Sequence, residues 1–228
     1  KVRPDFVINC IGAIKQKDSR PETMIELNAV FPWRVARMTQ ESGAKLVHLS
    51  TDCVFDGKDG NYFDNSRFSA VDTYGLSKAL GEISNMENVL TLRTSIIGRE
   101  LDNHLSLVDW FLSQPDTSTL KGYRSAIYSG FPTLSLAKII RGFLNENEFV
   151  HGLFNISSDP INKYDLLCRV RELFDRSVKI EPVDEPAIDR SLNSQKIREI
   201  SKMDIPHSWD QLIGDLLIDK EFYERLSQ

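Results

Sequence analysis

Lys45-Leu46-Val47-His48-Leu49-Ser50-Thr51-Asp52 is the stretch of sequence that decides the fold. Residues 45–50 predict a strand, since their apolar side chains come in a short run between polar residues. The strand ends in Ser-Thr-Asp, and open parallel sheets bind ligands beyond the carboxyl ends of their strands. We therefore expect this strand to open into a functional site.

Strands and helices alternate on both sides of this stretch. Phe6–Cys10 predicts a central parallel strand, and Val89–Arg93 and Gly152–Ile156 predict two more. Helices are expected over residues 21–42, 73–86, 105–112, 133–145 and 163–174. We expect residues 123–128 to be irregular, and residues 178–228 to contain a short strand, proline-rich turns and one or two helices. The alternation predicts an α/β protein with a doubly wound parallel sheet.

Tyr74-Gly-Leu-Ser-Lys78 follows in the next predicted helix. A spacing of four residues places the phenol and the ammonium group on the same helical face. There the positive charge of Lys78 is expected to lower the pKa of Tyr74, which would make the phenol an acid or base near neutral pH. Thr51 would add a hydroxyl from the strand end. The structural alternative is an amphipathic helix with a half-buried tyrosine and a solvated lysine.

Three predicted strands end in small or polar residues. These endings are Asn9–Gly12, Ser50–Asp52 and Thr94–Ser95. Because the carboxyl ends of parallel strands share one edge of the sheet, the three endings are expected to converge on one binding site. Taken singly, each ending is equally consistent with an ordinary turn.

Bulk composition narrows the class of protein. The chain has 228 residues, is 41% hydrophobic and 27% charged, and carries a net charge of -5. This balance predicts a globular cytoplasmic protein and argues against nucleic acid or a membrane as its partner. Its three cysteines, Cys10, Cys53 and Cys168, lack metal-ligand spacing and are expected to be reduced thiols. His48 is expected in a strand, and His104, His151 and His207 on the surface, so no metal site is predicted.

The motifs together resemble the extended short-chain dehydrogenase/reductase superfamily, especially its dTDP-4-dehydrorhamnose reductase branch. The most specific blocks are Ser50-Thr51-Asp52-x-Val54-Phe55-Asp56-Gly57 and Tyr74-Gly75-x-Ser77-Lys78-x-x-Gly81-Glu82, in that order. Shorter matches are Pro4-Asp5-x-Val7-Ile8-Asn9, Glu26-Leu27-Asn28, Leu92-Arg93-Thr94-Ser95, Phe131-Pro132-Thr133 and Leu192-Asn193-x-x-Lys196. The resemblance implies a Rossmann-type sheet with a smaller C-terminal substrate-binding part.

The resemblance also implies roles for individual residues. Tyr74 would donate a proton to a carbonyl oxygen of a 4-keto-6-deoxy sugar nucleotide, while NADPH or NADH supplies hydride to the carbon. Lys78 would hold the cofactor ribose, and Thr51 would bind the substrate oxygen. Cofactor contacts are implied for Cys10, Ile11, Gly12, Asn28, Ser50, Tyr74, Lys78, Thr94 and Ser95. Substrate contacts are implied for Thr51, Asp52, Cys53, Phe55, Tyr74 and Ile96.

Three departures from the family pattern stand out. The sequence has no Gly-x-x-Gly-x-x-Gly turn to admit a pyrophosphate at a helix N-terminus. Its first strand resembles the fourth of the family, so we expect an N-terminally truncated fold that lacks three βα units. Cys53 and Ile96 stand where rhamnose reductases have an aromatic residue and commonly a tryptophan, which leaves the exact sugar open.

Residues 1–98, with residues 133–157, are expected to form the remaining half of the dinucleotide-binding domain. Residues 99–132 and 158–228 would form the substrate-binding part. The leading hypothesis is a reductase for surface polysaccharide biosynthesis. A homodimer is a possible assembly of this reductase. An epimerase or dehydratase of the same superfamily is the second hypothesis. The third is a non-catalytic regulatory subunit, because the regulatory subunit of methionine adenosyltransferase resembles the same branch.

Overall fold

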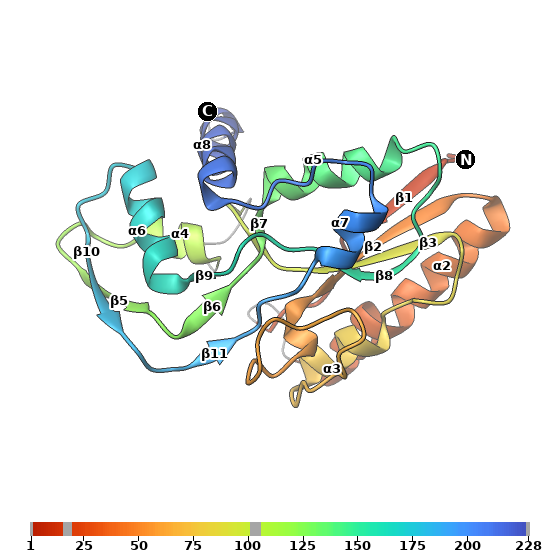
Figure 1. Ribbon diagram of the computed structural model, residues 1–228, viewed down its shortest axis with the longest axis horizontal. Coiled ribbons are helices and arrows are strands. Elements are labelled where there is room, and N and C mark those ends of the chain that lie inside the picture. Colours follow the sequence, from red (N-terminus) through yellow and green to blue (C-terminus); the bar gives the residue numbers. More distant parts are fainter. Residues whose placement is uncertain (1, 16–19, 101–105, 227–228) are drawn as a thin grey trace.

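Four parallel strands form the main sheet of the chain (Figure 1). The computed structural model describes residues 2–15, 20–100 and 106–226. The strands are β1 (Phe6–Asn9), β2 (Lys45–Thr51), β3 (Val89–Thr94) and β8 (Gly152–Asn155), and they pair in the order β1-β2-β3-β8. The doubly wound parallel sheet predicted from the alternation of elements is confirmed.

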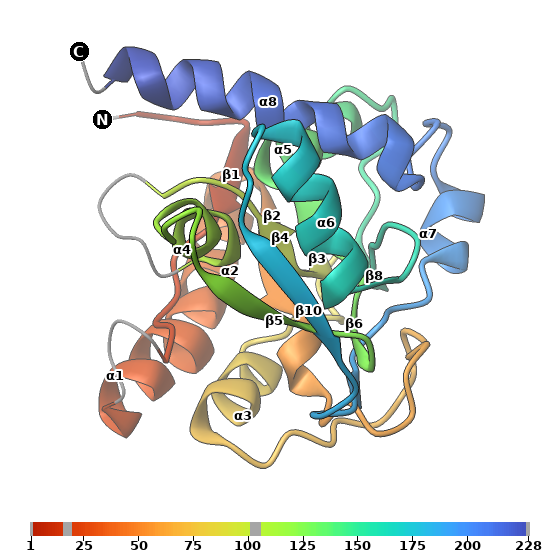
Figure 2. The same ribbon diagram turned by 90° about the vertical axis from the view of Figure 1, so that its left-hand side faces the viewer.

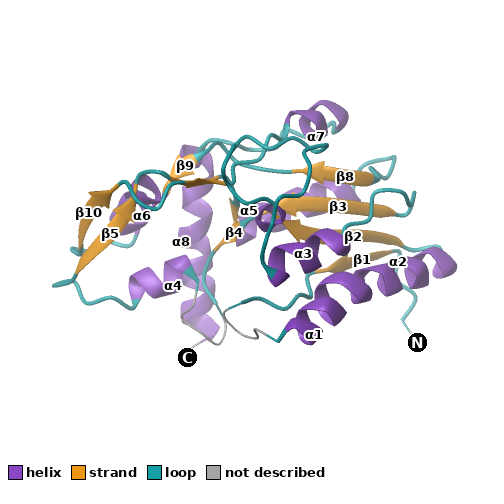
Figure 3. Ribbon diagram, turned by 90° about the horizontal axis from the view of Figure 1, so that it is seen from below, coloured by secondary structure: helices purple, strands orange, loops and turns teal. Residues whose placement is uncertain are grey.

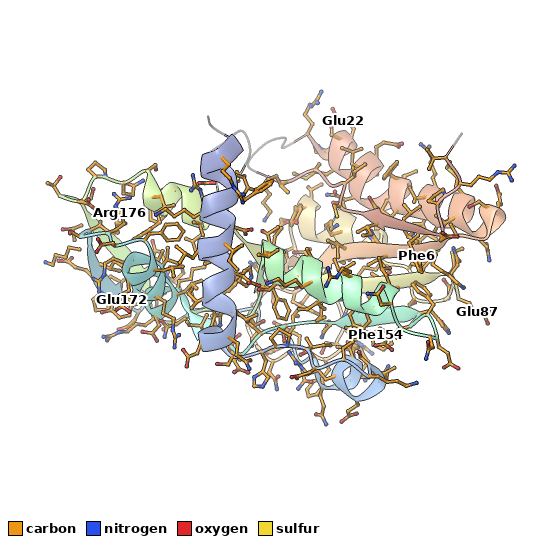
Figure 4. The ribbon with its side chains drawn as sticks, turned by 90° about the horizontal axis from the view of Figure 1, so that it is seen from above. Phe6, Glu22, Glu87, Phe154, Glu172 and Arg176 are labelled. Carbon is orange, nitrogen blue, oxygen red and sulfur yellow. The ribbon has the colours of Figure 1, made fainter. Side chains whose placement is uncertain are left out.

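Helices cover both faces of this sheet, as Figures 3 and 4 show from opposite sides. One face carries the helical stretch Pro21–Ser42 and α3 (Thr73–Leu80), and the other carries α5 (Thr133–Leu144). Alternate residues of β2 pack on the two faces of the sheet, since successive side chains of a strand point to opposite sides. Leu46 packs with Ala36 of the first face, whereas Val47 packs with Leu136 and Phe154 of the second.

The helical stretch has three parts. It begins as α1 (Pro21–Met24), continues as a π-helical segment, η1 (Ile25–Val30), and becomes α2 (Phe31–Ser42). Gly43, at a φ of 77°, ends it in the left-handed conformation that glycine adopts without steric cost. The predicted helix is confirmed, but its central π turn was not foreseen.

Three expectations about the elements are wrong. β1 is an edge strand of the described sheet, not a central one, and its Phe6 and Ile8 are 39% and 45% exposed. Figure 4 shows Phe6 at this margin. α3 ends at Leu80, six residues before the predicted end, because Gly81 caps it. Residues 123–128 are not irregular, because Tyr123 ends the strand β5 (Thr119–Tyr123) and residues 126–128 form the strand β6 (Ala126–Tyr128).

Most of the remaining elements gather beyond the carboxyl edge of the sheet, in front of it in the view of Figure 2. They pack on a second apolar core that includes Phe111, Leu166 and Trp209, whereas Phe131 and Ile197 belong to the core on the α5 face of the main sheet. The elements are β4 (Ile96–Ile97), α4 (Leu107–Leu112), β7 (Phe131–Pro132), β9 (Ile161–Asn162), α6 (Lys163–Leu173), β10 (Lys179–Val183), β11 (Ile188–Asp189), α7 (Gln195–Ile200) and α8 (Trp209–Leu226). α8 contacts both α5 and α6 and so joins the two cores.

The predicted helix over residues 105–112 corresponds to α4, and Leu105 lies outside the described residues. The helices expected at residues 133–145 and 163–174 are confirmed as α5 and α6. Among the helices that the structure describes, none has the length and apolar character needed to span a bilayer.

Candidate functional site

Thr51 ends β2 and starts a short 3-10 turn, η2 (Asp52–Val54). Its hydroxyl accepts a hydrogen bond from the backbone N–H of Cys53 at 3.1 Å and donates one to the Asp52 carboxylate at 3.1 Å. The side chain is therefore fixed as an N-cap, and it is 7% exposed. This arrangement holds the Thr51 hydroxyl at the carboxyl edge of the sheet.

α3 presents Tyr74 and Lys78 to the same edge. Asp72 caps the helix by accepting a hydrogen bond from the backbone N–H of Gly75 at 2.9 Å. Lys78 Nζ donates a hydrogen bond to the backbone carbonyl of Leu49 at 2.7 Å, which ties the helix to β2. Tyr74 hydrogen-bonds to Thr51. The structure thus brings together Thr51, Tyr74 and Lys78, the three residues that the sequence grouped.

The expected effect on Tyr74 has the wrong sign. Burial raises the pKa of Tyr74 above its ordinary value, and the charges of Cys53, Asp52 and Asp72 add to this increase. The hydrogen bond with Thr51 lowers the pKa, but it does not offset burial. The lysine spacing suggested a lowered pKa because it considered one charge and ignored desolvation. The phenol of Tyr74 consequently keeps its proton at neutral pH, which is the form a proton donor needs.

Lys78 faces the residues that follow β1. A Cβ built on Gly12 would lie 3.9 Å from Lys78 Nζ and 3.1 Å from Asn28 Oδ1, so glycine avoids a tight contact with the Asn28 side chain here. Burial lowers the pKa of Lys78 to about 8, while the charges of Glu82 and Cys10 raise it. The predicted meeting of the β1 and β2 endings is confirmed.

Asn28 lies in the π-helical segment η1 and is fully buried. Its side-chain amide accepts a hydrogen bond from the N–H of Ala13 at 2.8 Å and donates to the carbonyl of Ala13 at 3.0 Å. It also donates to Ser77 Oγ at 3.1 Å. These bonds join the β1 ending to α3, and π turns are frequent at functional sites. The buried Asn28 side chain therefore supports the backbone of the β1 ending.

The other predicted contact residues fall into two groups. Cys10, Ile11, Gly12 and Ile96 are exposed, and Cys53 and Ser95 are half-buried, so all six are open to a ligand to some extent. Ser50 and Thr94 are buried, and the Ser50 hydroxyl donates to Glu82 at 2.6 Å. Phe55 is fully buried and stacks on Tyr62 with the ring centroids 4.1 Å apart. The side chain of Phe55 therefore belongs to the core.

Three further residues meet at the site. Lys15 forms an ion pair with Asp72 at 2.7 Å and lies 5.7 Å from the Tyr74 ring centroid. The Arg190 charge lowers the pKa of Asp52, although burial dominates and raises it. Tyr128 lies beside Ser95, and burial raises the pKa of its phenol. Arg190 and Tyr128 lie just outside the short matches at residues 192–196 and 131–133, and no motif position marks either of them.

His48 is buried in β2, as predicted for a strand residue. Its Nδ1 lies 3.1 Å from the amide nitrogen of Asn9, whose Oδ1 accepts a hydrogen bond from the N–H of Ile11 at 3.1 Å. Burial lowers the pKa of His48 to about 3, and the charge of Lys78 adds to this effect. A neutral His48 thus holds the Asn9 side chain, which in turn fixes the backbone of Ile11 after β1.

We expect His48 to make the folded state sensitive to acid. The unfolded chain binds a proton at His48 near pH 6.5, but the folded chain does so only near pH 3. The stability contributed by the neutral ring is present above pH 6.5 and is lost at about 1.4 kcal/mol per pH unit below it. Urea unfolding of wild type and His48→Asn should therefore show a stability gap that narrows as the pH falls from 6.5 to 4. His151→Asn is the control because His151 is exposed; parallel curves for His48→Asn would contradict this account.

Side chains of the metal-binding type do not form a cluster of three or more anywhere in the described ranges. Cys10, Cys53 and Cys168 are free thiols. Burial raises the pKa of Cys53 to about 12, which disfavours the thiolate that nucleophilic catalysis needs. His151 and His207 are exposed as expected, and His104 lies outside the described residues.

Two sequence relatives share different parts of the chain. dTDP-4-dehydrorhamnose reductase of Salmonella typhimurium is 36% identical over 101 residues, which cover 42% of this chain and 34% of the relative. Methionine adenosyltransferase 2 subunit beta of Rattus norvegicus is 25% identical over 209 residues, which cover 85% of this chain and 63% of the relative. The chain therefore spans less than two thirds of either relative.

Solved structures confirm the Rossmann-type fold. dTDP-4-dehydrorhamnose reductase of Bacillus anthracis, in complex with NADP, superposes with a TM-score of 0.78 at 20% identity, over 95% of this chain and 81% of its own. A hypothetical dTDP-4-dehydrorhamnose reductase of Sulfolobus tokodaii gives a TM-score of 0.76 at 26% identity, over 90% and 77% of the two chains. A profile described as the RmlD substrate binding domain matches residues 1–196. Since that match covers well over half of the sequence, the chain belongs to the RmlD substrate binding domain family.

Proposed function

We propose that this chain carries the proton-donor site of an NAD(P)H-dependent sugar-nucleotide reductase. The observation that carries the proposal is the convergence of Thr51, Tyr74 and Lys78 at the carboxyl edge of a parallel sheet. Reduction of a ketone needs one well-placed acid beside the carbonyl oxygen and a dry, oriented site. Tyr74 is half-buried and keeps its proton, so it meets the first need.

The three side chains have distinct tasks in this proposal. Tyr74 donates the proton to the carbonyl oxygen, and Thr51 donates a hydrogen bond to the same oxygen once it releases Asp52. Lys78, at a pKa of about 8, is mostly charged at neutral pH and holds the ribose of the cofactor. Its positive charge also stabilises the phenolate that remains on Tyr74 after proton transfer.

The nicotinamide end of a cofactor fits this site. The exposed backbone of Cys10 to Gly12 has no side chain at Gly12 and faces Lys78, which leaves room for ribose hydroxyls. The cofactor would supply hydride to the carbonyl carbon. The pyrophosphate end lacks its usual partner, because no Gly-x-x-Gly-x-x-Gly turn occurs among the 228 residues. Binding of a whole dinucleotide is therefore the step that most needs a direct test.

The substrate proposed is a 4-keto-6-deoxy sugar nucleotide, used in surface polysaccharide synthesis. Exposed Ile96 and half-buried Cys53 would contact the sugar, with Asp52 and Tyr128 behind them. Residues 99–132 and 158–228 would provide the substrate-binding part around the second core. Residues 1–98 with 133–157 would hold the cofactor, and a homodimer stays a prediction.

A second candidate is a regulatory subunit without turnover. The match to methionine adenosyltransferase 2 subunit beta covers 85% of the chain, twice the share matched by the Salmonella reductase. The intact Thr51, Tyr74 and Lys78 favour the reductase, because a purely regulatory role does not require an acid at this place.

The first test is a fluorescence titration of the protein with NADPH and NADH. Saturable binding that competes with a dTDP-sugar, followed by NADPH oxidation on adding the 4-keto sugar nucleotide, is the result expected of the complete gene product. Binding without oxidation, together with copurification of a larger enzyme, would favour the regulatory subunit. Absence of binding to complete, folded protein would refute the reductase.

A further inference from the structure

A buried ion pair lies directly behind the proposed proton-donor site. Glu82 Oε2 accepts a hydrogen bond from Arg93 NH2 at 2.8 Å, and Glu82 Oε1 accepts one from Arg93 Nε at 2.9 Å. Both side chains are 2% exposed. A pair this deeply buried gains little net stability over well-packed apolar residues, because desolvation offsets the attraction. Its presence therefore calls for a reason besides stability.

Glu82 continues a regular set of contacts between α3 and β2. Tyr74 and Lys78 are spaced by four residues and lie along one side of α3, and Glu82 follows directly after the Gly81 cap. Tyr74 meets Thr51, Lys78 donates to the carbonyl of Leu49, and Glu82 accepts from the hydroxyl of Ser50 at 2.6 Å. Three consecutive strand residues thus fix the position of α3. Lys78 and Glu82 are thus both anchored to β2, on adjacent strand residues.

Arg93 connects Glu82 to the next strand, β3. It pairs with Ser50 across β2 and β3, so both residues reach Glu82 from the same face of the sheet. Its guanidinium carbon lies 5.2 Å from the ring centroids of Phe55 and Phe68, and its NH1 donates to the carbonyl of Asp64 at 3.0 Å. Planar stacking and several N–H donors suit arginine and not lysine.

We propose that the Glu82–Arg93 pair is a positioning device for the reaction, in which Glu82 sets the register of α3 and keeps the neighbouring Lys78 charged. Glu82 and Arg93 are positioning residues, since neither lies among the groups that would touch substrate or cofactor. The proposal rests on the proposed function for its consequence in catalysis, but not for the effect of the Glu82 charge on Lys78.

The charges around Lys78 agree with this assignment. Cys10 faces it from the β1 ending, His48 from β2, Tyr74 from its own helix and Glu82 from the segment just after that helix, with Arg93 of β3 beyond Glu82. His48 is neutral above pH 3 and Tyr74 is neutral at pH 7, so the Glu82 carboxylate is the fixed negative charge of this group. It raises the pKa of Lys78 against the larger effect of burial. Removing it leaves burial opposed only by the smaller effect of Cys10, and the Lys78 pKa falls.

The direct test is an NMR titration of the Lys78 side chain in protein labelled with 13C-lysine, with Lys78→Arg used to assign the signal. Wild type should titrate at a midpoint of about 8. In Glu82→Gln, the midpoint should fall by roughly one pH unit, because a nearby opposite charge typically changes a pKa by this amount. Glu26→Gln is the matched control, since Glu26 also pairs with an arginine, Arg34, but on the surface. An unmoved Lys78 midpoint in folded Glu82→Gln would overturn the proposal.

The double variant Glu82→Gln/Arg93→Met guards against misfolding of the single variant, because it leaves no unpaired buried charge. Its Lys78 midpoint should lie below that of wild type, though by less, since the more distant Arg93 charge is also lost. A midpoint at or above wild type would count against the proposal. The NMR readout needs no turnover, so a moved midpoint in a protein without reductase activity would refute only the proposed function. In an active reductase, the alkaline limb of kcat against pH should move with the midpoint.

Discussion

Tyr74→Phe is expected to lower kcat of the complete reductase by about 10²- to 10⁴-fold, the range that a positioned general acid contributes. The substitution removes one oxygen atom and leaves the ring, so α3 keeps its contacts with β2 through Lys78 and Glu82. The KM for NADPH should remain unchanged, since Lys78 and the Gly12 backbone are the groups placed at the ribose. Steady-state kinetics with NADPH absorbance as the readout measure both quantities.

Tyr164→Phe is the matched control for this experiment. Tyr164 is a half-buried tyrosine of α6 in the second core, far in sequence and fold from the proton-donor site. It should retain wild-type kcat, which shows that the loss in Tyr74→Phe is not a general effect of removing a phenol. Wild-type turnover in Tyr74→Phe would eliminate Tyr74 as the proton donor. A raised KM for NADPH with kcat unchanged would instead assign the phenol to cofactor binding.

The parts of the site that could be predicted depend on local sequence. The position of Ser50-Thr51-Asp52 at the end of a strand places these residues at the edge of the sheet. The four-residue spacing of Tyr74 and Lys78 places both on one face of a helix. Parallel pairing then brings the strand endings to one edge, as the register of Thr51 opposite Thr94 confirms. The core helices α5 and α6 were equally predictable from their apolar periodicity.

The parts that could not be predicted depend on contacts between distant segments. The charge of Arg190 acts on Asp52, although more than a hundred residues separate the two in sequence. Glu82 and Arg93 come into contact only when β3 pairs with β2. The sign of the Tyr74 pKa shift depends on burial, which a spacing of residues does not report. The strands β5 and β6 are short and half-exposed, so their apolar residues gave too little periodicity to distinguish them from a loop.

The end of α3 at Leu80 could not be predicted from the sequence either, because Gly81 adopts an ordinary helical conformation, with a φ of -85°. The glycine is needed for space and not for its dihedral angles. A Cβ built on Gly81 would lie 1.9 Å from the backbone carbonyl oxygen of Asn28 and 3.0 Å from its carbon. Two helical segments, η1 and α3, therefore cross here with their backbones in contact, and this crossing delivers both Asn28 and Lys78 to the β1 ending.

Gly81→Ala is accordingly expected to destabilise the folded protein by about 3 kcal/mol or more, since the atom that blocks the methyl group is backbone and cannot rotate away. Gly214→Ala, in the middle of α8 with nothing within 4 Å of the added Cβ, is the matched control and should stabilise the fold by up to about 1 kcal/mol. Urea unfolding of the two variants measures the contrast. If Gly81→Ala is destabilised and NADPH binding is also lost, the helix crossing determines both stability and the site. If Gly81→Ala unfolds like wild type, η1 and α3 can separate without loss of stability. The claim that their backbone contact positions Asn28 and Lys78 would then be wrong.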